Sequence, residues 1–432
     1  MQLKNFTNEL QWRGMIHDVM PDTDTHLMEQ MRSAYVGFDP TADSLHIGNL
    51  VPIMLLSFYQ RCGHRPIALV GGATGMIGDP SGKSSERNLL DEKTLRHNQE
   101  CVREQLSRFL DFTSGVENQA VMVNNYDWMK DFSFLDFIRD VGKHIPVNYM
   151  MAKDSVKSRL TGENAEGMSF TEFTYQLVQG FDFLHLFRAH DCTLQMGGSD
   201  QWGNITTGTE LIRRMDSGKG YALTCPLITK SDGSKFGKSE GGNVWLDSKR
   251  TSPYKFYQYW LNTSDDDAEK YIKIFTFLDK ATIDSLVAEH KEAPYKYMLQ
   301  KRLGKEVTTT VHGEEAYQNA AKASEVLFSK TASDDIRKLD EATFLDIFDG
   351  VPMVELEMGL ISNGLDIIGA LAEKTGFLKS NSEARRALKE NSISVNMSKV
   401  REGYTITSED LINNTFILLE RGKKSKFILR IV

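Results

Sequence analysis

The sequence predicts an α/β fold, with a parallel sheet in the first half of the chain, then a helical region and a small α+β domain. Apolar runs at 65–70, 120–123 and 192–196 end at glycine or asparagine, and helical patterns such as 92–109 lie between them. Short buried strands that alternate with helices are typical of a parallel sheet. Because ligands bind beyond the carboxyl ends of such strands, we expect a site in the polar, glycine-rich segments there.

The length and composition are those of an ordinary globular protein. At roughly 150 residues per domain, the 432 residues suggest domains at 1–230, 231–345 and 365–432. Apolar runs such as 67–70 are far shorter than the ~20 residues that span a bilayer. The amino-terminal segment lacks a basic stretch followed by an apolar one. We therefore expect a cytoplasmic protein without a membrane partner.

The cysteines predict no metal centre. None belongs to a C-x-x-C pair, and without a secretory signal they are expected to be reduced thiols. We therefore expect no cysteine-ligated structural zinc site. We also expect no tightly bound cofactor. The cysteines are Cys62, Cys101, Cys192 and Cys225.

Charge is distributed unevenly along the chain. Residues 376–432 contain eleven Lys/Arg and six Asp/Glu, a net charge of +5, whereas the whole chain carries −8. A basic segment on an acidic body is typical of a nucleic-acid-binding appendage, although a solvated tail has the same composition. Ser380 and Glu383 have capping-box spacing, which predicts a helix from there to about 391.

Residues 35–50 contain a Pro- and Gly-bearing loop and a predicted helix start near Leu45, capped by Asp43 or Ser44. His46 and Asn49, three residues apart, would share a helical face, and Gly48 would let a ligand approach the backbone. A helix amino terminus with an imidazole and an amide suits phosphate oxygens. An ordinary capped helix would have the same pattern.

The glycine-rich segment 71–84 matches neither common nucleotide-binding motif. A P-loop would need glycine where Ile77 stands, and no start gives the spacing of a dinucleotide fingerprint. What remains is a loop at a strand end that carries Asp79, Lys83 and Arg87. So many glycines are unfavourable to order, which argues against a plain solvated turn.

Three polar groups share one face of a predicted helix at 170–182. Tyr175, Gln179 and Asp182 are spaced i, i+4 and i+7, and apolar residues flank them. A polar stripe is usually solvated, but apolar neighbours favour a buried pocket whose polar groups need partners.

Two further segments carry candidate binding groups. Residues 197–204 follow the third strand and offer Gly198, Asp200 and Gln201. A plain strand-to-helix turn would have the same sequence pattern. Residues 235–239 place Lys235 and Lys238 in a glycine-rich loop, where they can neutralise phosphates. An exposed basic loop is the alternative.

Together these segments resemble the class I aminoacyl-tRNA synthetases. His-Ile-Gly-Asn at 46–49 is similar to the HIGH signature, and Lys-Phe-Gly-Lys-Ser at 235–239 to the KMSKS signature. The remaining segments narrow the resemblance to the bacterial-type tyrosyl branch. Residues 365–432 resemble an S4-type RNA-binding domain. The resemblance covers nearly the whole chain. It implies a Rossmann-like catalytic domain, a helical domain and a small α+β S4-like domain.

The resemblance also implies a reaction and its partners. Tyrosine would react with ATP and Mg²⁺ to give tyrosyl-adenylate and pyrophosphate, and the tyrosyl group would pass to the 3′ end of tRNA(Tyr). A homodimer is implied, through an apolar insertion at about 125–160. Asn49 departs from the family pattern, which usually has a second histidine there. Two rivals are a synthetase for tryptophan and an RNA-binding regulator with a retired nucleotide fold.

The site residues implied by the resemblance fall into four groups. The groups that would stabilise the leaving pyrophosphate are Thr41, His46, Asn49, Lys83, Arg87, Lys235 and Lys238. The tyrosine-binding groups would be Tyr35, Asp79, Tyr175, Gln179, Asp182 and Gln201. ATP would contact Gly37, Asp39, His46, Gly48, Asn49, Gly198, Asp200, Lys235 and Lys238. The tRNA contacts would be Arg385, Arg386, Lys389, Lys423 and Lys424.

Overall fold

The computed structural model describes residues 2–77, 91–154, 156–157, 167–234, 236–239, 242–326, 332–422 and 425–432. The chain forms two compact units. Unit 1 comprises Met1–Thr251 and Tyr259–Val311, and unit 2 comprises Ser252–Gln258 and His312–Val432.

Unit 1 is built on a six-stranded sheet of order β1-β6-β5-β2-β3-β4, in which only the edge strand β1 is antiparallel to its neighbour. The three predicted strands are confirmed as β3, β4 and β5. The strands are β1 (Asp18–Val19), β2 (Ser33–Phe38), β3 (Arg65–Val70), β4 (Val121–Asn124), β5 (Cys192–Gly198) and β6 (Tyr221–Cys225).

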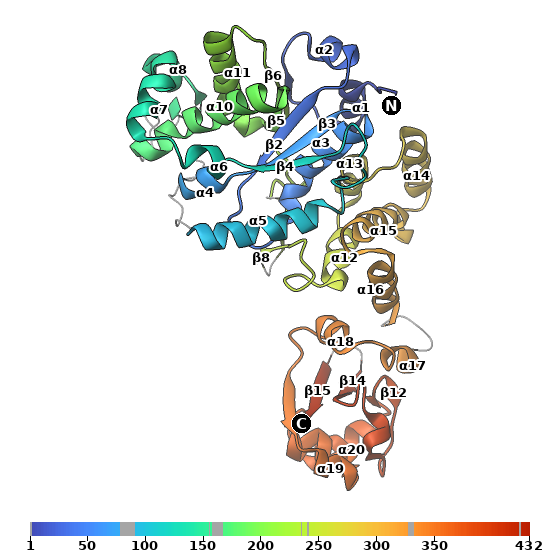
Figure 1. Cartoon of the computed structure of the whole chain (residues 1–432). Coiled ribbons are helices and arrows are strands. Elements are labelled where there is room, and N and C mark those ends of the chain that lie inside the picture. Colours follow the sequence, from blue (N-terminus) through green and yellow to red (C-terminus); the bar gives the residue numbers. More distant parts are fainter. Residues whose placement is uncertain are drawn as a thin grey trace. The chain divides into compact units, whose positions relative to one another are not determined.

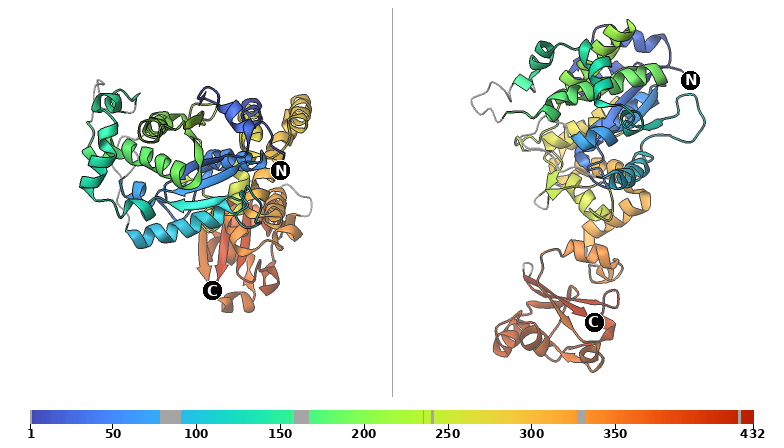
Figure 2. Two further views of the ribbon diagram at one scale, coloured as in Figure 1. Left: turned by 45° about the horizontal axis from the view of Figure 1, so that its top comes forward. Right: turned by 60° about the vertical axis from the view of Figure 1, so that its left-hand side comes forward.

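Helices cover both faces of this sheet (Figures 1 and 2). The long helices are α3 (Leu50–Arg61), α5 (Glu92–Leu106), α10 (Phe170–His190) and α11 (Trp202–Asp216). The chain runs from β2 through α3 to β3 in one direction and from β5 through α11 to β6 in the other. Right-handed crossovers in opposite directions place α3 and α11 on opposite faces. The strand order therefore reverses between β2 and β5, where open α/β sheets bind ligands.

The remaining elements of unit 1 complete this layered domain. Before β5 they are α1 (Phe6–Arg13), α2 (Thr23–Glu29), η1 (Ile47–Asn49), α4 (Gly72–Ile77), α6 (Tyr126–Met129), α7 (Phe134–Asp140), η2 (Gly142–His144) and α8 (Val147–Met151). After β5 come η3 (Ser199–Gln201), β7 (Lys238–Ser239), β8 (Gly242–Asn243), α13 (Asp265–Phe275), α14 (Lys280–Glu292), η4 (Pro294–Lys296) and α15 (Met298–His312). Helix α12 (Pro253–Leu261) has residues in both units, and Ser252 caps it by accepting from the Lys255 amide, as its sequence predicts.

Unit 2 combines helices with a five-stranded sheet of order β12-β11-β14-β15-β9 and a two-stranded pair, β10 with β13. Its strands are β9 (Met353–Leu356), β10 (Leu365–Asp366), β11 (Ile393–Val395), β12 (Ser398–Lys399), β13 (Thr405–Ile406), β14 (Phe416–Arg421) and β15 (Ser425–Ile431). Its helices are α16 (Glu314–Val326), α17 (Ala332–Ile336), α18 (Glu341–Ile347), α19 (Met358–Ser362), the π-helical turn η5 (Gly369–Lys374), α20 (Asn381–Lys389) and η6 (Ser408–Asp410).

Both faces of the unit 2 sheet are buried. Alternate residues of β14 point to opposite sides: Ile417 and Leu419 pack with α20, whereas Phe416 and Leu418 pack with α18. Strand β9 pairs in parallel with β15. The sheet therefore begins before residue 365, where the sequence places the start of its last domain. Strand β9 has only four residues, and two of its side chains are exposed, so the sequence shows no strand pattern there.

Candidate functional site

A cavity of about 450 Å³ opens at the carboxyl ends of β2 and β5, where the strand order reverses. It brings together the expected tyrosine- and ATP-site residues that the structure describes, with the exception of Gly48, whose amide lies in the adjacent turn, and Lys238. Those that line it are Tyr35, Gly37, Asp39, Thr41, His46, Asn49, Tyr175, Gln179, Asp182, Gly198, Asp200 and Gln201. Asp79, Lys83, Arg87 and Lys235 lie outside the described residues, and Lys238 is described by its backbone, in β7.

The turn at 46–49 differs from the helix predicted there. Helix α3 begins at Leu50 rather than near Leu45, and the cap of the preceding turn η1 is His46 instead of Asp43 or Ser44. The His46 Nδ1 accepts from the Gly48 amide at 3.0 Å, and the Asn49 Oδ1 accepts from the His46 amide at 3.0 Å. Because Nδ1 is an acceptor, the neutral imidazole carries its proton on Nε2 and can donate from there.

The reason for the difference is a contact that is distant in sequence. The Ile47 amide donates to the Val244 carbonyl at 2.8 Å, and the Leu246 amide donates to the Leu45 carbonyl at 2.8 Å. The backbone is thereby extended at 45–46, with His46 bridged to Trp245. Trp245 also lines the cavity. Strand-like pairing, which no local pattern indicates, thus delays the helix and fixes the His46 ring beside the cavity.

A buried carboxyl and a buried hydroxyl face one part of the cavity. Tyr35 and Asp182 are each 1% exposed. Burial raises the pKa of Asp182 to about 7, even though Asn125 and Trp128 each donate to its carboxylate at 2.9 Å. Within the described residues, the Tyr35 hydroxyl has no hydrogen-bond partner. Since buried polar groups are almost always paired, this pair suits a ligand hydroxyl that accepts from Tyr35 and donates to Asp182.

Asn125 and Trp128 were missed by the sequence reasoning. Asn125 follows β4 directly, and its side chain also accepts from the Ala73 amide at 2.7 Å and donates to Thr74 at 3.1 Å. Trp128 stacks on His185, with ring centroids 4.3 Å apart. The position of Asn125 at a strand's carboxyl end was the one available signal.

Amide side chains line another part of the cavity. Gln179 donates to Gln201 at 3.3 Å and accepts from Asn204 at 3.0 Å. Gln195 in β5 is 2% exposed and lines the cavity, and its Oε1 has no partner in the described part of the chain. Gln195 was missed because it lies within a strand, where the apolar pattern dominates. These groups can orient a polar ligand by several hydrogen bonds.

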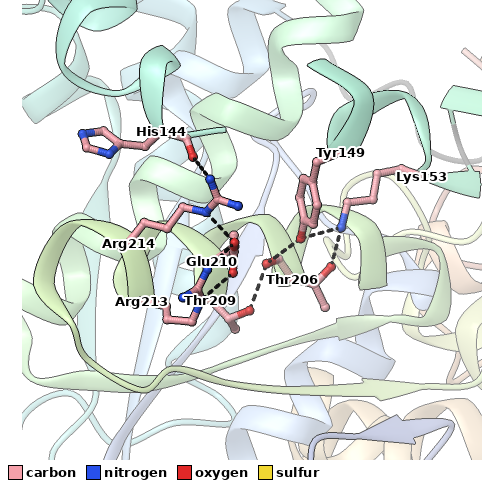
Figure 3. A network of polar contacts seen from close by, with 8 residues as sticks. All are labelled: His144, Tyr149, Lys153, Thr206, Thr209, Glu210, Arg213 and Arg214. Atoms are coloured by element: carbon pink, nitrogen blue, oxygen red, sulfur yellow. Dashed lines mark hydrogen bonds and ion pairs between the residues drawn. The ribbon is translucent and has the colours of Figure 1, made fainter. Parts of the chain in front are cut away.

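A second polar network lies on α11, the helix that starts beside the cavity (Figure 3). Lys153 donates to the Tyr149 hydroxyl and to Thr206, both at 2.9 Å. Arg214 donates to the His144 carbonyl at 2.9 Å. Together with Arg213, Arg214 lowers the pKa of Glu210 to about 2. The network fastens segment 144–153 to α11 and thereby supports that end of the site.

The described residues contain neither a metal-binding cluster nor a membrane-spanning helix. No group of three or more His, Cys, Asp or Glu side chains there is placed to hold a metal ion. No helix in the same residues combines the length and the hydropathy needed to cross a bilayer.

A parallel sheet with a cavity at its switch point, beside a HIGH-like turn, is the arrangement of a class I aminoacyl-tRNA synthetase. The family model for tRNA synthetases class I (W and Y) matches residues 28–329, and that for the tyrosine--tRNA ligase SYY-like C-terminal domain matches residues 343–429. The chain belongs to the tyrosine--tRNA ligase family and is a ligase of that specificity.

The chain is similar to tyrosine--tRNA ligases over nearly its full length. The tyrosine--tRNA ligase of Flavobacterium johnsoniae is 63% identical over 432 residues, 100% of each chain. That of Bacteroides fragilis is 60% identical over 426 residues, 98% of this chain and 99% of the relative. The crystal structure of a C-terminally truncated mitochondrial tyrosyl-tRNA synthetase from Aspergillus nidulans is 30% identical, with a TM-score of 0.67. It covers 75% of this chain and 94% of that one.

Proposed function

We propose that the cavity binds tyrosine and ATP together and that the chain's residues activate tyrosine by position and charge. The tyrosine carboxylate attacks the α-phosphate of ATP, tyrosyl-adenylate forms and pyrophosphate leaves. The 3′-terminal ribose of tRNA(Tyr) then takes the tyrosyl group and AMP leaves. No protein nucleophile is needed, because holding the two substrates in line and stabilising the leaving charge lower the barrier.

The observation that carries the proposal is the Tyr35 hydroxyl, which lies beside Asp182 and has no hydrogen-bond partner among the residues that the structure describes. A tyrosine phenol completes both groups, since it accepts from Tyr35 and donates to the Asp182 carboxylate. Phenylalanine would leave both buried groups without a partner, which is unfavourable. The indole of tryptophan offers a donor but no acceptor. The indole therefore could not accept the hydrogen bond that the Tyr35 hydroxyl donates.

The amide-lined part of the cavity suits the amino end of tyrosine. Tyr175, Gln179 and Gln201 would hold the ammonium group, with Asp79 supplying the opposing charge. The amide chain from Asn204 through Gln179 to Gln201 supports this role, because it fixes the orientation of both glutamines.

ATP would occupy the remaining part of the cavity. Gly37, Asp39, Gly198 and Asp200 would contact the adenosine side. Thr41, His46, Gly48 and Asn49 would contact the phosphates, assisted by Mg²⁺ that arrives with ATP. The charged groups proposed to stabilise the leaving pyrophosphate are Lys83, Arg87, Lys235 and Lys238.

The basic segment of unit 2 would bind tRNA(Tyr) through its phosphates, as an S4-like domain would. Arg385 and Arg386 on α20 are 56% and 67% exposed, and their ion pairs with Glu402 and Glu390 are long, at 3.4 and 4.0 Å. Exposed pairs of this kind are weak, so phosphates can replace them. Lys389 is exposed on the same helix. Lys423 and Lys424, which lie outside the described residues, complete the proposed contacts.

A homodimer through the insertion at 125–160 is the remaining proposal. The apolar residues of that segment divide into two sets: Ile145 and Met150 are buried, at 4% and 3%, whereas others are exposed. A cluster of exposed apolar side chains supports a protein interface. The exposed set comprises Phe134, Leu135, Ile138, Val147 and Met151.

Amino-acid-dependent pyrophosphate exchange, run with each amino acid in turn, tests the proposed reaction. We expect exchange with tyrosine and ATP, and little with phenylalanine or tryptophan. Exchange with tryptophan at an equal rate would overturn the assignment of Tyr35 and Asp182. A lack of exchange with any amino acid would favour the RNA-binding regulator.

A further inference from the structure

An aromatic receptacle receives the side chain of Phe236, the residue between the two lysines of the 235–239 loop. The Phe236 ring stacks on Phe275, with centroids 5.2 Å apart and planes 5° apart, and lies 5.0 Å from the Tyr271 ring. The rings of Tyr259 and Trp260, at the end of α12, are each 6.1 Å away. Trp260, Tyr271 and Phe275 are at most 4% exposed. The receptacle is therefore part of the unit 1 core, whereas Phe236 is a loop residue inserted into it.

The backbone next to Phe236 is held from two sides. The Gly237 amide donates to the Tyr259 hydroxyl at 3.1 Å, and the Gly237 carbonyl accepts from the Val244 amide at 3.1 Å. Burial raises the pKa of Tyr259 to about 12, so the hydroxyl stays neutral. The receptacle thus contributes both an apolar slot for Phe236 and a hydrogen bond to the residue that follows.

Gly237 lies directly against the HIGH-like turn. Its φ of +88° favours glycine, and a Cβ built on it would lie 3.1 Å from the backbone nitrogen of Gly48. Val244, which holds Gly237, also accepts from the Ile47 amide at 2.8 Å. The loop that carries the lysines and the turn that carries His46 are therefore in backbone contact at Gly237, the residue that follows Phe236.

The wall of the receptacle is itself clamped. Tyr271 and Phe275 belong to α13, and Arg13 of α1 donates to three carbonyls at the end of that helix: Lys273 at 2.6 Å, Thr276 at 3.0 Å and Leu278 at 2.8 Å. Arg13 is only 3% exposed. A buried guanidinium that caps a helix carboxyl terminus holds that end rigidly. Phe236 therefore docks on a fixed surface.

We propose that Phe236 is a positioning residue for tyrosine activation, which acts through Lys235 and Lys238 by docking the loop on the HIGH-like turn. The proposal rests on the proposed role of these lysines on the leaving pyrophosphate. Charge stabilisation depends on distance, so a loop released from the receptacle would keep its lysines but lose their alignment. The proposed tyrosine-binding residues, Tyr35 and Asp182, do not belong to this loop or its receptacle, so tyrosine binding should be unaffected.

The experiment measures pyrophosphate exchange and tyrosine affinity for Phe236→Ala, Phe236→Leu, Tyr259→Phe and Phe277→Ala in the full chain. Phe277 is the matched control, because its ring packs on Phe58 and Arg61 and not on the loop. We expect Phe236→Ala to lower kcat for exchange by roughly ten- to a hundredfold with an unchanged tyrosine Kd. Phe236→Leu should recover much of the loss, Tyr259→Phe should lose a few-fold, and Phe277→Ala should match the unaltered chain.

A double-mutant cycle separates positioning from a general structural effect. If Phe236 acts through the lysines, Phe236→Ala should add little to the loss caused by Lys235→Ala with Lys238→Ala. Independent, multiplicative losses would overturn the proposal, as would an unchanged kcat in Phe236→Ala or a tyrosine Kd that weakens in step with kcat. Lysine variants with full activity would instead refute the proposed role of Lys235 and Lys238 on the leaving pyrophosphate.

Discussion

The two ends of the cavity are built in different ways. At the proposed tyrosine end, Tyr35 and Asp182 project from a central strand and a long helix, and both are almost fully buried. At the proposed phosphate end, His46 and Asn49 lie on the 46–49 turn. That turn and Gly237 of the neighbouring loop are held by backbone hydrogen bonds to segment 244–246, and the Phe236 ring is inserted into the aromatic receptacle.

The difference follows from what each end must do. Discrimination against a substrate without a hydroxyl requires buried partners that cannot be satisfied by water, and rigid elements supply these. Stabilisation of a charge that develops during the reaction requires cations at the right place, and turns can present them where side chains on the sheet cannot. We expect changes at the tyrosine end to alter specificity, and changes at the phosphate end to alter rate.

The largest effect should come from the loop lysines. Lys235→Ala combined with Lys238→Ala should slow adenylate formation by ~10²–10³-fold, because the pyrophosphate charge loses its neutralising groups in the transition state. Tyrosine affinity should change little. Single-turnover adenylate formation and equilibrium dialysis with tyrosine measure the two quantities. Equal losses in both would remove the distinction between the two ends.

Removal of the carboxylate should have the next largest effect. Asp182→Ala should reduce the ratio of kcat/KM for tyrosine over phenylalanine by roughly ten- to a hundredfold, because the phenol loses its charged acceptor. Asp182→Asn is the matched control: it keeps the shape and an acceptor oxygen, so it should retain more of the ratio. An unchanged ratio in Asp182→Ala would show that the hydroxyl is recognised elsewhere.

A smaller effect should be visible in the pH dependence of specificity. The pKa of Asp182 is raised to about 7 by burial, and the phenol donates best to the ionised form. Tyrosine affinity should therefore rise by up to about tenfold per pH unit below this pKa and level off above it. The affinity for phenylalanine should not rise with pH, because phenylalanine has no hydroxyl to donate. Titration of both affinities from pH 5.5 to 8.5 measures the effect, and Asp182→Asn should abolish it.

The same shift has a consequence for stability in the absence of ligand. An aspartate released by unfolding has its ordinary pKa of 3.8, so the unfolded chain loses this proton first as pH rises. The contribution of Asp182 to the free energy of unfolding should therefore fall between pH 3.8 and about 7 and stay constant above. Saturating tyrosine should reduce the fall, since it stabilises the ionised form. A tyrosine affinity that does not change with pH across this range would contradict the raised pKa of Asp182, on which both the affinity and the stability predictions rest.

The sequence predicted the elements that local patterns determine. The strand at 65–70 was confirmed with the same bounds as β3, and the predicted cap at Ser380 was confirmed by its bond from the Glu383 amide at 3.2 Å. The predicted capping box is incomplete, because Glu383 accepts from the Lys379 amide instead of that of Ser380. The domain limits, the roles of the site residues and the homodimer stay predictions.

What the sequence did not predict depends on contacts between distant segments. The helix start near Leu45 was wrong because pairing with residues almost 200 positions later extends the backbone there. Gln195 of β5 lines the cavity, and Asn125 and Trp128, which follow β4, donate to Asp182 at its wall. Their own neighbours in sequence gave little sign of a site. Polar site residues that lie next to a motif can be identified from the sequence. Those that the fold brings to the site from other segments can be identified only from the structure.

The smallest effect should come from the one departure in the HIGH-like motif, and it gives the finest test of the comparison. The Asn49 Oδ1 accepts from the His46 amide and so shapes the turn that presents His46. In Asn49→His, the ring Nδ1 can accept the same bond while Nε2 donates further toward the phosphates. We expect a change in the KM for ATP or in kcat of less than about fivefold, the size of a capping interaction, and an unchanged KM for tyrosine.

Asn49→Ala is the matched variant, because it removes the acceptor and the donor together. It should lower the exchange rate more than Asn49→His does, since the turn loses its reciprocal cap and His46 loses its fixed direction. Steady-state exchange with varied ATP and varied tyrosine separates the two KM values. If either variant shifts the tyrosine KM by more than the ATP KM, the phosphate end and the tyrosine end are coupled through the turn, and the division of rate from specificity does not hold at Asn49.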